Sequence, residues 1–194
     1  DRWQERNNVL GIGLRGKTLG VIGIGNIGSE LLRLAKPWGM THLGCDPYAP
    51  SEGYPDLSVC LVDLDSLLKD ADFICLCCPY NHRTRRMIGE RELNLMKPTA
   101  YLINTARGEI VHEAALIEVL SKNKIAGAAI DVFENEPPNS DNPLFKLENV
   151  ILSSHNISLS DEGNRLGNQA VASAVLAVAR GEVPKNVINP EVLD

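Results

Sequence analysis

The sequence predicts an α/β fold in which a doubly wound parallel sheet carries helices on both faces. Two observations lead to this prediction. Short apolar runs alternate with helical patterns along most of the 194-residue chain, as expected where parallel strands are joined by right-handed helical crossovers. The run over 72–78 is apolar almost throughout, which is typical of a parallel strand covered on both faces.

Each expected element has a local reason. The apolar runs predict strands over 18–22, 41–45, 72–78, 100–103, 126–130 and 150–153, with a short edge segment over 59–62. Apolar residues at helical spacing predict helices over 29–35, 63–70, 90–95, 112–121 and 160–179. Pro37 and Pro98 end two of these helices because proline cannot continue a helix. Asp63 is a suitable N-cap for the second helix.

Three glycines follow the first strand directly, and the rest of the chain is organised around them. Gly23 permits a tight turn, Gly25 lets the backbone approach a pyrophosphate, and Gly28 lets the next helix pack close to the strand. The N–H groups and the positive dipole end of that helix then face the phosphates. This stretch therefore predicts a dinucleotide-binding loop.

An acidic residue at the end of the second strand indicates which dinucleotide binds. Asp46 closes the 41–45 run, about 20 residues after the glycines, as the dinucleotide-binding pattern requires. A carboxylate there accepts hydrogen bonds from the adenosine ribose and repels a 2′-phosphate. The prediction is NAD as the cofactor, against the simpler interpretation of a glycine-rich turn beside a surface aspartate.

Composition and charge exclude several classes of partner. The net charge is −6, with acids and bases interspersed, whereas a nucleic-acid-binding protein carries a basic face. The longest apolar stretch, 170–179, is too short to cross a bilayer. The polar opening residues are unlike a signal peptide. We therefore expect neither nucleic acid nor a membrane among the partners.

The five cysteines predict no metal site. Four of them fall on expected strands or strand ends, where neighbouring side chains point to opposite faces instead of converging on an ion. Free thiols buried as small apolar residues fit this pattern better. Because free thiols are typical of a reducing compartment, the expected location is cytoplasmic.

Polar residues follow several apolar runs directly. In a parallel sheet the carboxyl ends of the strands meet at one edge, where ligands bind. Besides the glycine loop and Asp46, the residues at this edge are Cys78-Pro79, Thr105-Ala106-Arg107, Asp131 and His155.

Two of these side chains have chemistry suited to a reaction. The guanidinium of Arg107 suits bidentate binding of a carboxylate, and the imidazole of His155 suits proton transfer. A surface arginine and a histidine capping a strand end are the simpler interpretations. Glu136 could pair with an imidazole, but it also has a simpler interpretation, as a carboxylate on an exposed proline-rich loop.

Several longer motifs appear in order along the chain. They are the segment 14–20 before the glycine loop, Cys78-Pro79, 96–98, 103–108, 127–133 with Glu136-Pro137, and 149–152 before His155. Together they resemble the cofactor domain of the D-isomer-specific 2-hydroxyacid dehydrogenases, and the resemblance covers nearly the whole chain. It implies an NAD-binding Rossmann domain of an enzyme that interconverts D-2-hydroxy acids and 2-oxo acids.

The resemblance also implies a role for each residue. Arg107 would hold the carboxylate and carbonyl of the 2-oxo acid, His155 would give or take the proton at C2, and Glu136 would orient His155. The residues implied to bind the cofactor are Gly23, Gly25, Asn26, Ile27, Gly28, Asp46, Cys78, Pro79, Thr84, Thr105, Ala106, Asp131 and His155.

Three departures from the family pattern affect other parts of the site. The residues after His155 are Asn-Ile-Ser-Leu-Ser instead of small residues rich in Gly and Ala. Tyr80-Asn81-His82 stands where Leu-Thr-Pro is usual, and Asn26 replaces a common arginine. These changes affect substrate shape, nicotinamide seating and the phosphate side, and they leave the three implied catalytic residues in place.

The expected organisation is a lead-in over 1–16, a dinucleotide-binding domain over 17–180 and a C-terminal tail over 181–194. The second lobe that completes the family's active site is absent from this chain. We therefore expect the chain to bind NAD and to be inactive by itself, with its particular 2-hydroxy acid unassigned. The resemblance also implies a homodimer through the cofactor domains, with Trp3 at the interface.

Two other functions fit the same residues. The corepressors called C-terminal binding proteins resemble these dehydrogenases and use NAD(H) to control assembly, so an NAD(H)-sensing binding protein is one alternative. Another is a different NAD-dependent Rossmann enzyme without the Arg107, Glu136 and His155 site. Substitution of His155 separates enzyme from sensor, and a Glu136 far from His155 favours the other enzyme.

Overall fold

The computed structural model describes Trp3 and residues 11–193, with side chains up to Val192. Most of the expected lead-in over 1–16 therefore lies outside the described residues. The contacts divide the chain into two units, Asp1–Ser154 and His155–Asp194. This boundary falls inside the range 17–180 that the sequence predicts as one domain, and those domain bounds stay a prediction.

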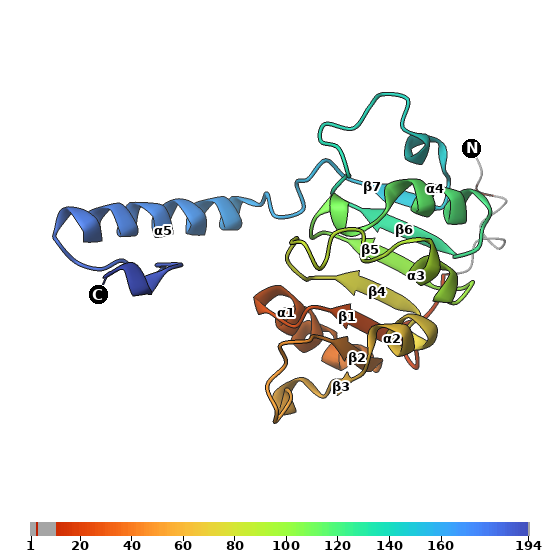
Figure 1. Ribbon diagram of the computed structural model, residues 1–194, viewed down its shortest axis with the longest axis horizontal. Helices are drawn as coiled ribbons and strands as arrows, with labels where there is room; N and C mark the ends of the chain where they lie inside the picture. The colour runs from red at the N-terminus through yellow and green to blue at the C-terminus, as the bar shows by residue number, and fades with distance from the viewer. Residues whose placement is uncertain (1–2, 4–10, 194) are drawn as a thin grey trace. The chain divides into compact units, whose positions relative to one another are not determined.

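The first unit contains one seven-stranded sheet in which every pair of neighbouring strands is parallel. The order across the sheet is β3-β2-β1-β4-β5-β6-β7 (Figure 1). From β1 to β3 successive strands are added toward one edge of the sheet, and from β4 to β7 they are added toward the other. The boundary between β1 and β4 is therefore the switch point at which such sheets bind ligands. The predicted fold class is confirmed. The strands are β1 (Thr18–Ile22), β2 (Thr41–Cys45), β3 (Cys60–Leu61), β4 (Phe73–Leu76), β5 (Tyr101–Asn104), β6 (Gly127–Ile130) and β7 (Val150–Leu152).

Helices cover both faces of this sheet. The helices of the first unit are α1 (Asn26–Ala35), α2 (Leu64–Asp70), α3 (Glu90–Leu95) and α4 (Glu113–Ser121). Side chains alternate along β1: Leu19 and Val21 pack in the cluster that contains Leu32 of α1. Ile22 packs in the larger cluster, to which α2, α3 and α4 contribute. The strand is therefore buried on both faces, as its continuous apolar run predicts.

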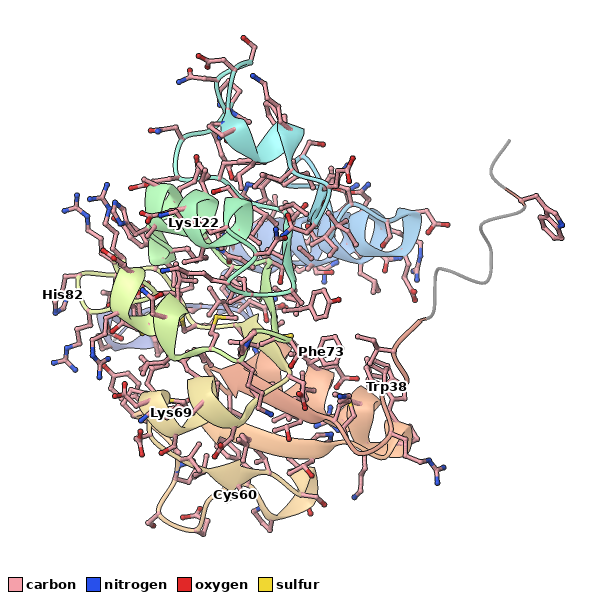
Figure 2. The ribbon with its side chains drawn as sticks, turned by 90° about the vertical axis from the view of Figure 1, so that its right-hand side faces the viewer. Trp38, Cys60, Lys69, Phe73, His82 and Lys122 are labelled. Carbon is pink, nitrogen blue, oxygen red and sulfur yellow. The ribbon has the colours of Figure 1, made fainter. Side chains whose placement is uncertain are left out.

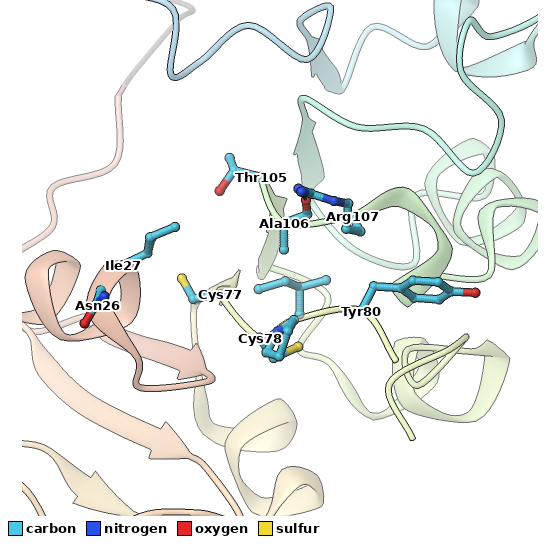
Figure 3. A pocket seen from close by; sticks show the side chains of 10 residues that line it. Asn26, Ile27, Cys77, Cys78, Tyr80, Thr105, Ala106 and Arg107 are labelled. Atoms are coloured by element: carbon cyan, nitrogen blue, oxygen red, sulfur yellow. Dashed lines mark hydrogen bonds between the residues drawn. The ribbon is translucent and has the colours of Figure 1, made fainter. Parts of the chain in front are cut away.

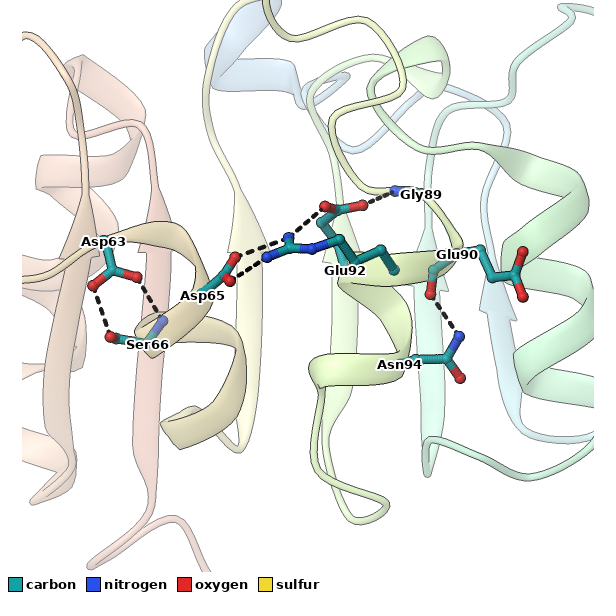
Figure 4. Close-up of polar contacts among 8 residues, drawn as sticks. Asp63, Asp65, Ser66, Gly89, Glu90, Glu92 and Asn94 are labelled. Carbon is teal, nitrogen blue, oxygen red and sulfur yellow. Dashed lines mark hydrogen bonds and ion pairs between the residues drawn. The ribbon is translucent and has the colours of Figure 1, made fainter.

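Polar contacts fasten α2 and α3 to one another (Figure 4). The Asp63 carboxylate accepts hydrogen bonds from the backbone N–H of Ser66 at 2.9 Å and from its hydroxyl at 2.8 Å, so Asp63 is the predicted N-cap. Such a cap stabilises the helix by satisfying an N–H group of its first turn. Arg91 of α3 pairs with Asp65 of α2 and with Glu92. Because Arg91 is exposed to solvent, these ion pairs contribute little to stability.

Several strand bounds differ from the predicted ones by one or two residues, and two of these differences lie close to the site. β4 ends at Leu76, two residues before the expected end, and Pro79, which has no N–H to donate to a neighbouring strand, follows three residues later. β5 includes Asn104, which is 1% exposed. A polar residue that ends an apolar run is easily assigned to the following loop. Here Asn104 belongs to the strand, and its side chain is buried at the carboxyl end of β5.

The expectation of buried thiols holds only in part. Cys78 is buried, and Cys45, Cys75 and Cys77 are half-buried. Burial raises the pKa of Cys75 to about 12 and that of Cys77 to about 11, so both thiols stay protonated. Cys60 is exposed instead (Figure 2), because β3 is the edge strand and has a neighbour on one side only.

The second unit is built on one long helix, α5 (Asp161–Ala179). The hydroxyl of Ser160 accepts a hydrogen bond from the N–H of Gly163 at 2.9 Å and so caps its first turn. The expected helix over 160–179 is confirmed, and the tail that follows contains a short 3₁₀ turn, Pro190–Leu193. Within the described part of the chain, no helix is both long and apolar enough to cross a membrane.

Candidate active site

The glycine loop has the backbone geometry that the sequence predicts. Gly23 has a φ of 90°, and a Cβ there would lie 2.6 Å from the backbone nitrogen of Cys78. A Cβ on Gly28 would lie 2.1 Å from the carbonyl oxygen of Gly23. Only glycine fits either position, so the loop turns sharply at Gly23 and α1 packs directly against it.

The beginning of α1 is open to an anion. Its N-cap, Gly25, has no side chain to cap the helix, and the first turn contains no acidic residue. The first N–H groups of a helix have no partner within the helix, and the dipole places positive charge there. A Cβ built on Gly25 meets nothing within 4 Å. These features fit a pyrophosphate group.

Asp46 is held in place at the end of β2. One carboxylate oxygen accepts a hydrogen bond from the N–H of Ile24 at 2.8 Å, and the other from the N–H of Tyr48 at 2.9 Å. Each oxygen has a second lone pair for a ribose hydroxyl. The Tyr54 phenol lies beside this carboxylate; partial burial, together with the charge of Asp46, raises the pKa of Tyr54.

A cavity of about 490 Å³ lies at the switch point between β1 and β4. Figure 3 shows Asn26 and Ile27 on one side of it, Thr105, Ala106 and Arg107 on the other, and Cys77 between. Seven predicted site residues line it: Asn26, Ile27, Cys78, Pro79, Thr105, Ala106 and Arg107. Its other lining residues, Leu76, Cys77 and Tyr80, were not predicted.

A second cavity of about 380 Å³ shares Asn26 with the first and is bounded by Gly25 and Tyr54. Two cavities that adjoin at the beginning of α1 suit an elongated ligand with a phosphate group in its middle. The residues present therefore fit a dinucleotide.

A buried amide shapes the turn that carries Arg107. The side-chain NH₂ of Asn104 donates to the carbonyl oxygen of Arg107 at 2.9 Å, and its side-chain oxygen accepts from the N–H of Ala106 at 3.1 Å. Arg107 itself is exposed and lines the larger cavity. Asn104 therefore fixes the turn that presents the guanidinium. Sequence reasoning missed it, although a polar amide closing an apolar strand was a usable signal.

The turn that carries Arg107 touches the turn that carries Glu136. A Cβ on Gly108 would lie 1.9 Å from the carbonyl oxygen of Phe133 and 2.5 Å from the nitrogen of Glu134. The two backbones are therefore in direct contact. Within the second turn, the N–H of Phe133 donates to a carboxylate oxygen of Glu136 at 3.0 Å. The structure thus brings together the two turns that carry two of the three implied catalytic residues.

Other predicted residues have different surroundings. The hydroxyl of Thr84 donates to the carbonyl oxygen of Pro79 at 2.7 Å and accepts from the N–H of Asn81 at 2.8 Å, so it holds the loop after β4 together. Asp131 is 3% exposed and accepts a hydrogen bond from the hydroxyl of Ser153 at 2.6 Å. His155 begins the second unit, and its part in the site stays a prediction.

A parallel, doubly wound sheet with this glycine loop, an open helix start and a carboxylate closing β2 defines a dinucleotide-binding Rossmann domain. The model of one protein family, "D-isomer specific 2-hydroxyacid dehydrogenase, NAD binding domain", matches residues 1–156. The chain belongs to this family, and NAD is the cofactor that the family binds through this domain.

Two relatives are each 45% identical to the chain. One is the D-3-phosphoglycerate dehydrogenase of Methanocaldococcus jannaschii, aligned over 95% of this chain and 35% of the relative. The other is the glyoxylate reductase of Thermococcus litoralis, aligned over 95% of this chain and 55% of the relative. The chain thus spans between about a third and just over half of the length of these relatives.

Solved structures are similar as well. A D-isomer specific 2-hydroxyacid dehydrogenase from Lactobacillus delbrueckii ssp. bulgaricus, in its NAD-complexed form, superposes with a TM-score of 0.84 at 31% identity. The match covers 94% of this chain and 59% of that one. D-lactate dehydrogenase with NAD⁺ from Lactobacillus jensenii gives a TM-score of 0.85 at 31% identity, covering 94% of this chain and 58% of that one. Both of these solved structures are named as dehydrogenases.

Proposed function

We propose that this chain is the cofactor-binding half of an NAD-dependent dehydrogenase that interconverts D-2-hydroxy acids and 2-oxo acids. One observation supports this most strongly: Gly108 brings the turns of Arg107 and Glu136 into backbone contact, and Arg107 lines the cavity beside the glycine loop. A carboxylate-binding guanidinium and a second carboxyl group at a dinucleotide site suit chemistry on a hydroxy acid.

The residues proposed to hold the cofactor extend along both cavities. Asn26 and Ile27 offer backbone N–H groups to the pyrophosphate, and Asp46 accepts the hydroxyls of the adenosine ribose. Cys78, Pro79, Thr105 and Ala106 line the larger cavity, which takes the nicotinamide half. Bound NADH supplies the hydride for reduction of the 2-oxo group.

The proposed substrate contacts begin with Arg107. Its guanidinium binds the carboxylate of the 2-oxo acid and holds the carbonyl carbon in place. His155 donates a proton to the carbonyl oxygen during reduction and accepts it back during oxidation. Glu136 orients His155. Because the chain spans only part of the length of its relatives, we propose that a further lobe supplies the remaining substrate contacts and that the chain alone binds NADH with little or no turnover.

The test uses the full-length reading frame that encodes this chain. We expect it to oxidise NADH, in preference to NADPH, with at least one 2-oxo acid among glyoxylate, hydroxypyruvate, phosphohydroxypyruvate and bulkier analogues. Arg107→Met and His155→Gln are each expected to lower kcat/KM roughly 100-fold and to leave the Kd for NADH within a few-fold of the unmutated value. Arg85→Met, on an exposed loop, is the matched control. Full activity of His155→Gln would support a different NAD-dependent enzyme instead.

We also propose that the protein forms a homodimer through its cofactor domains. Leu34, a large apolar side chain on α1, is 60% exposed. Trp38, 46% exposed, follows in the next turn. Leu34→Glu is expected to convert a dimer into a monomer in sedimentation velocity. A monomeric unmutated protein would overturn this proposal.

The proposed location is the cytoplasm. All five cysteines are free thiols, and unpaired thiols are typical of a reducing compartment. Cell fractionation tests this directly: recovery with the cytosolic fraction is expected, and recovery from the medium or an oxidising compartment would contradict it.

A further inference from the structure

A single carboxylate holds both ends of the loop that carries Glu136. This loop runs over 131–142, from the end of β6 at Ile130 to the 3₁₀ turn Pro143–Lys146. Glu113, the first residue of α4, contacts the loop near its beginning and at its end. None of the sequence motifs assigns a role to Glu113.

At the beginning of the loop, Glu113 and Glu134 bind one another reciprocally. The N–H of Glu134 donates to a carboxylate oxygen of Glu113 at 3.0 Å. In return, the N–H of Glu113 donates to a carboxylate oxygen of Glu134 at 3.3 Å. A reciprocal pair of this kind fixes two backbones against each other, because moving either one breaks both hydrogen bonds.

At the end of the loop, the other oxygen of Glu113 accepts a hydrogen bond from the side-chain NH₂ of Asn142 at 2.9 Å. Asn142 is 8% exposed. Its side-chain oxygen accepts the N–H of Leu144 at 3.0 Å, which fixes the orientation of the amide. The two oxygens of one side chain therefore hold two points that are eight residues apart in the sequence.

The anchor itself is rigid. Glu113 begins a helix whose inner face, Ala115, Leu116, Val119 and Leu120, is buried in the core. On the outer side, Arg86 pairs with the Glu134 carboxylate, with nitrogen–oxygen distances of 2.9 and 2.5 Å. The backbone N–H of Arg86 donates to the carbonyl oxygen of Glu109 at 2.7 Å. The loop is thus fastened to packed structure on two sides.

We propose that Glu113 is a positioning residue for the reaction, acting through Glu136. Glu136 lies two residues beyond Glu134, and its carboxylate accepts the N–H of Phe133. By fixing this short turn, Glu113 sets where the Glu136 carboxylate lies relative to the Arg107 turn. The inference rests on the proposed function, since it takes the role of Glu136 from there.

The test is Glu113→Gln in the full-length protein. Glutamine has the same size but replaces one accepting oxygen by an NH₂ group, so a donor faces a donor at one end of the loop. We expect kcat to fall roughly tenfold while the KM values for NADH and the 2-oxo acid stay within twofold. The matched control is Glu118→Gln on the same helix, whose exposed carboxylate pairs with Lys122.

A double-mutant cycle distinguishes positioning from general stability. If Glu113 acts through Glu136, Glu113→Gln should have no further effect in a Glu136→Gln background. A tenfold loss in both backgrounds, or a kcat equal to that of Glu118→Gln, would overturn the inference alone. An unmutated protein that oxidises no NADH would overturn the proposed function as well. Should Glu113→Gln fail to fold, Asn142→Ser is the second variant. Serine keeps an oxygen that can accept the N–H of Leu144, but it loses the hydrogen bond to Glu113, so only the far end of the loop is released. Its kcat is measured alone and in the Glu136→Gln background, with the same outcomes expected.

Discussion

Replacing Gly108 by alanine is expected to destabilise the chain by about 3 kcal/mol and to abolish 2-oxo acid reduction in the full-length protein. The added Cβ would lie 1.9 Å from the carbonyl oxygen of Phe133, 2.0 Å from its carbonyl carbon and 2.5 Å from the nitrogen of Glu134. All three are backbone atoms, so no side-chain rotation relieves the overlap. The turns carrying Arg107 and Glu136 must move apart, and urea unfolding with steady-state kinetics measures both effects.

Gly13→Ala is the control for this substitution, because a Cβ there meets nothing within 4 Å. It should change the free energy of unfolding by less than about 1 kcal/mol. A Gly108→Ala protein as stable and as active as the Gly13→Ala protein would show that the contact between the two turns is not required.

Gly28→Ala is expected to weaken NADH binding by the chain roughly 100-fold. Its Cβ would lie 2.1 Å from the carbonyl oxygen of Gly23, so α1 must shift away from the loop. The N–H groups at the helix start then no longer point at the pyrophosphate. Titration of NADH fluorescence with the 194-residue chain measures the change in Kd.

Gly25→Ala separates loss of binding from loss of structure. A Cβ on Gly25 meets nothing within 4 Å in this structure, so the variant should fold as well as the unmutated chain. It should still bind NADH more weakly, because the methyl group occupies the approach of the pyrophosphate. Unchanged NADH binding by Gly25→Ala would contradict the placement of the phosphates.

The sheet and the glycine loop were predictable because their signals are local. A continuous apolar run gives a strand buried on both faces, and the spacing of Gly23, Gly25 and Gly28 gives the turn and the close helix. The signal for the beginning of α2 was also local, because the side chain of Asp63 accepts a hydrogen bond from the N–H of Ser66, three residues further on. The cavity residues Thr105, Ala106 and Arg107 followed from the rule that ligands bind at the carboxyl edge of parallel strands.

What the sequence missed depends on residues far apart along the chain. Glu113 and Glu134 are 21 positions apart, and no periodicity connects them. The contact of Gly108 with Phe133 likewise exists only because β5 and β6 are neighbours in the sheet. The exposure of Cys60 follows from strand order, which makes β3 an edge. Tyr80 and Cys77 line the cavity from the loop that follows the end of β4 at Leu76.

The hydrogen-exchange footprint of NADH on this chain tests most directly where the cofactor binds. We expect the cavity between the glycine loop and the Arg107 turn to take the nicotinamide half of the cofactor. NADH should therefore slow exchange at 23–28 and also at 77–80 and 105–107, whereas adenosine diphosphate ribose should protect the first segment and leave 105–107 unchanged. Protection confined to the glycine loop with both ligands would contradict this expectation.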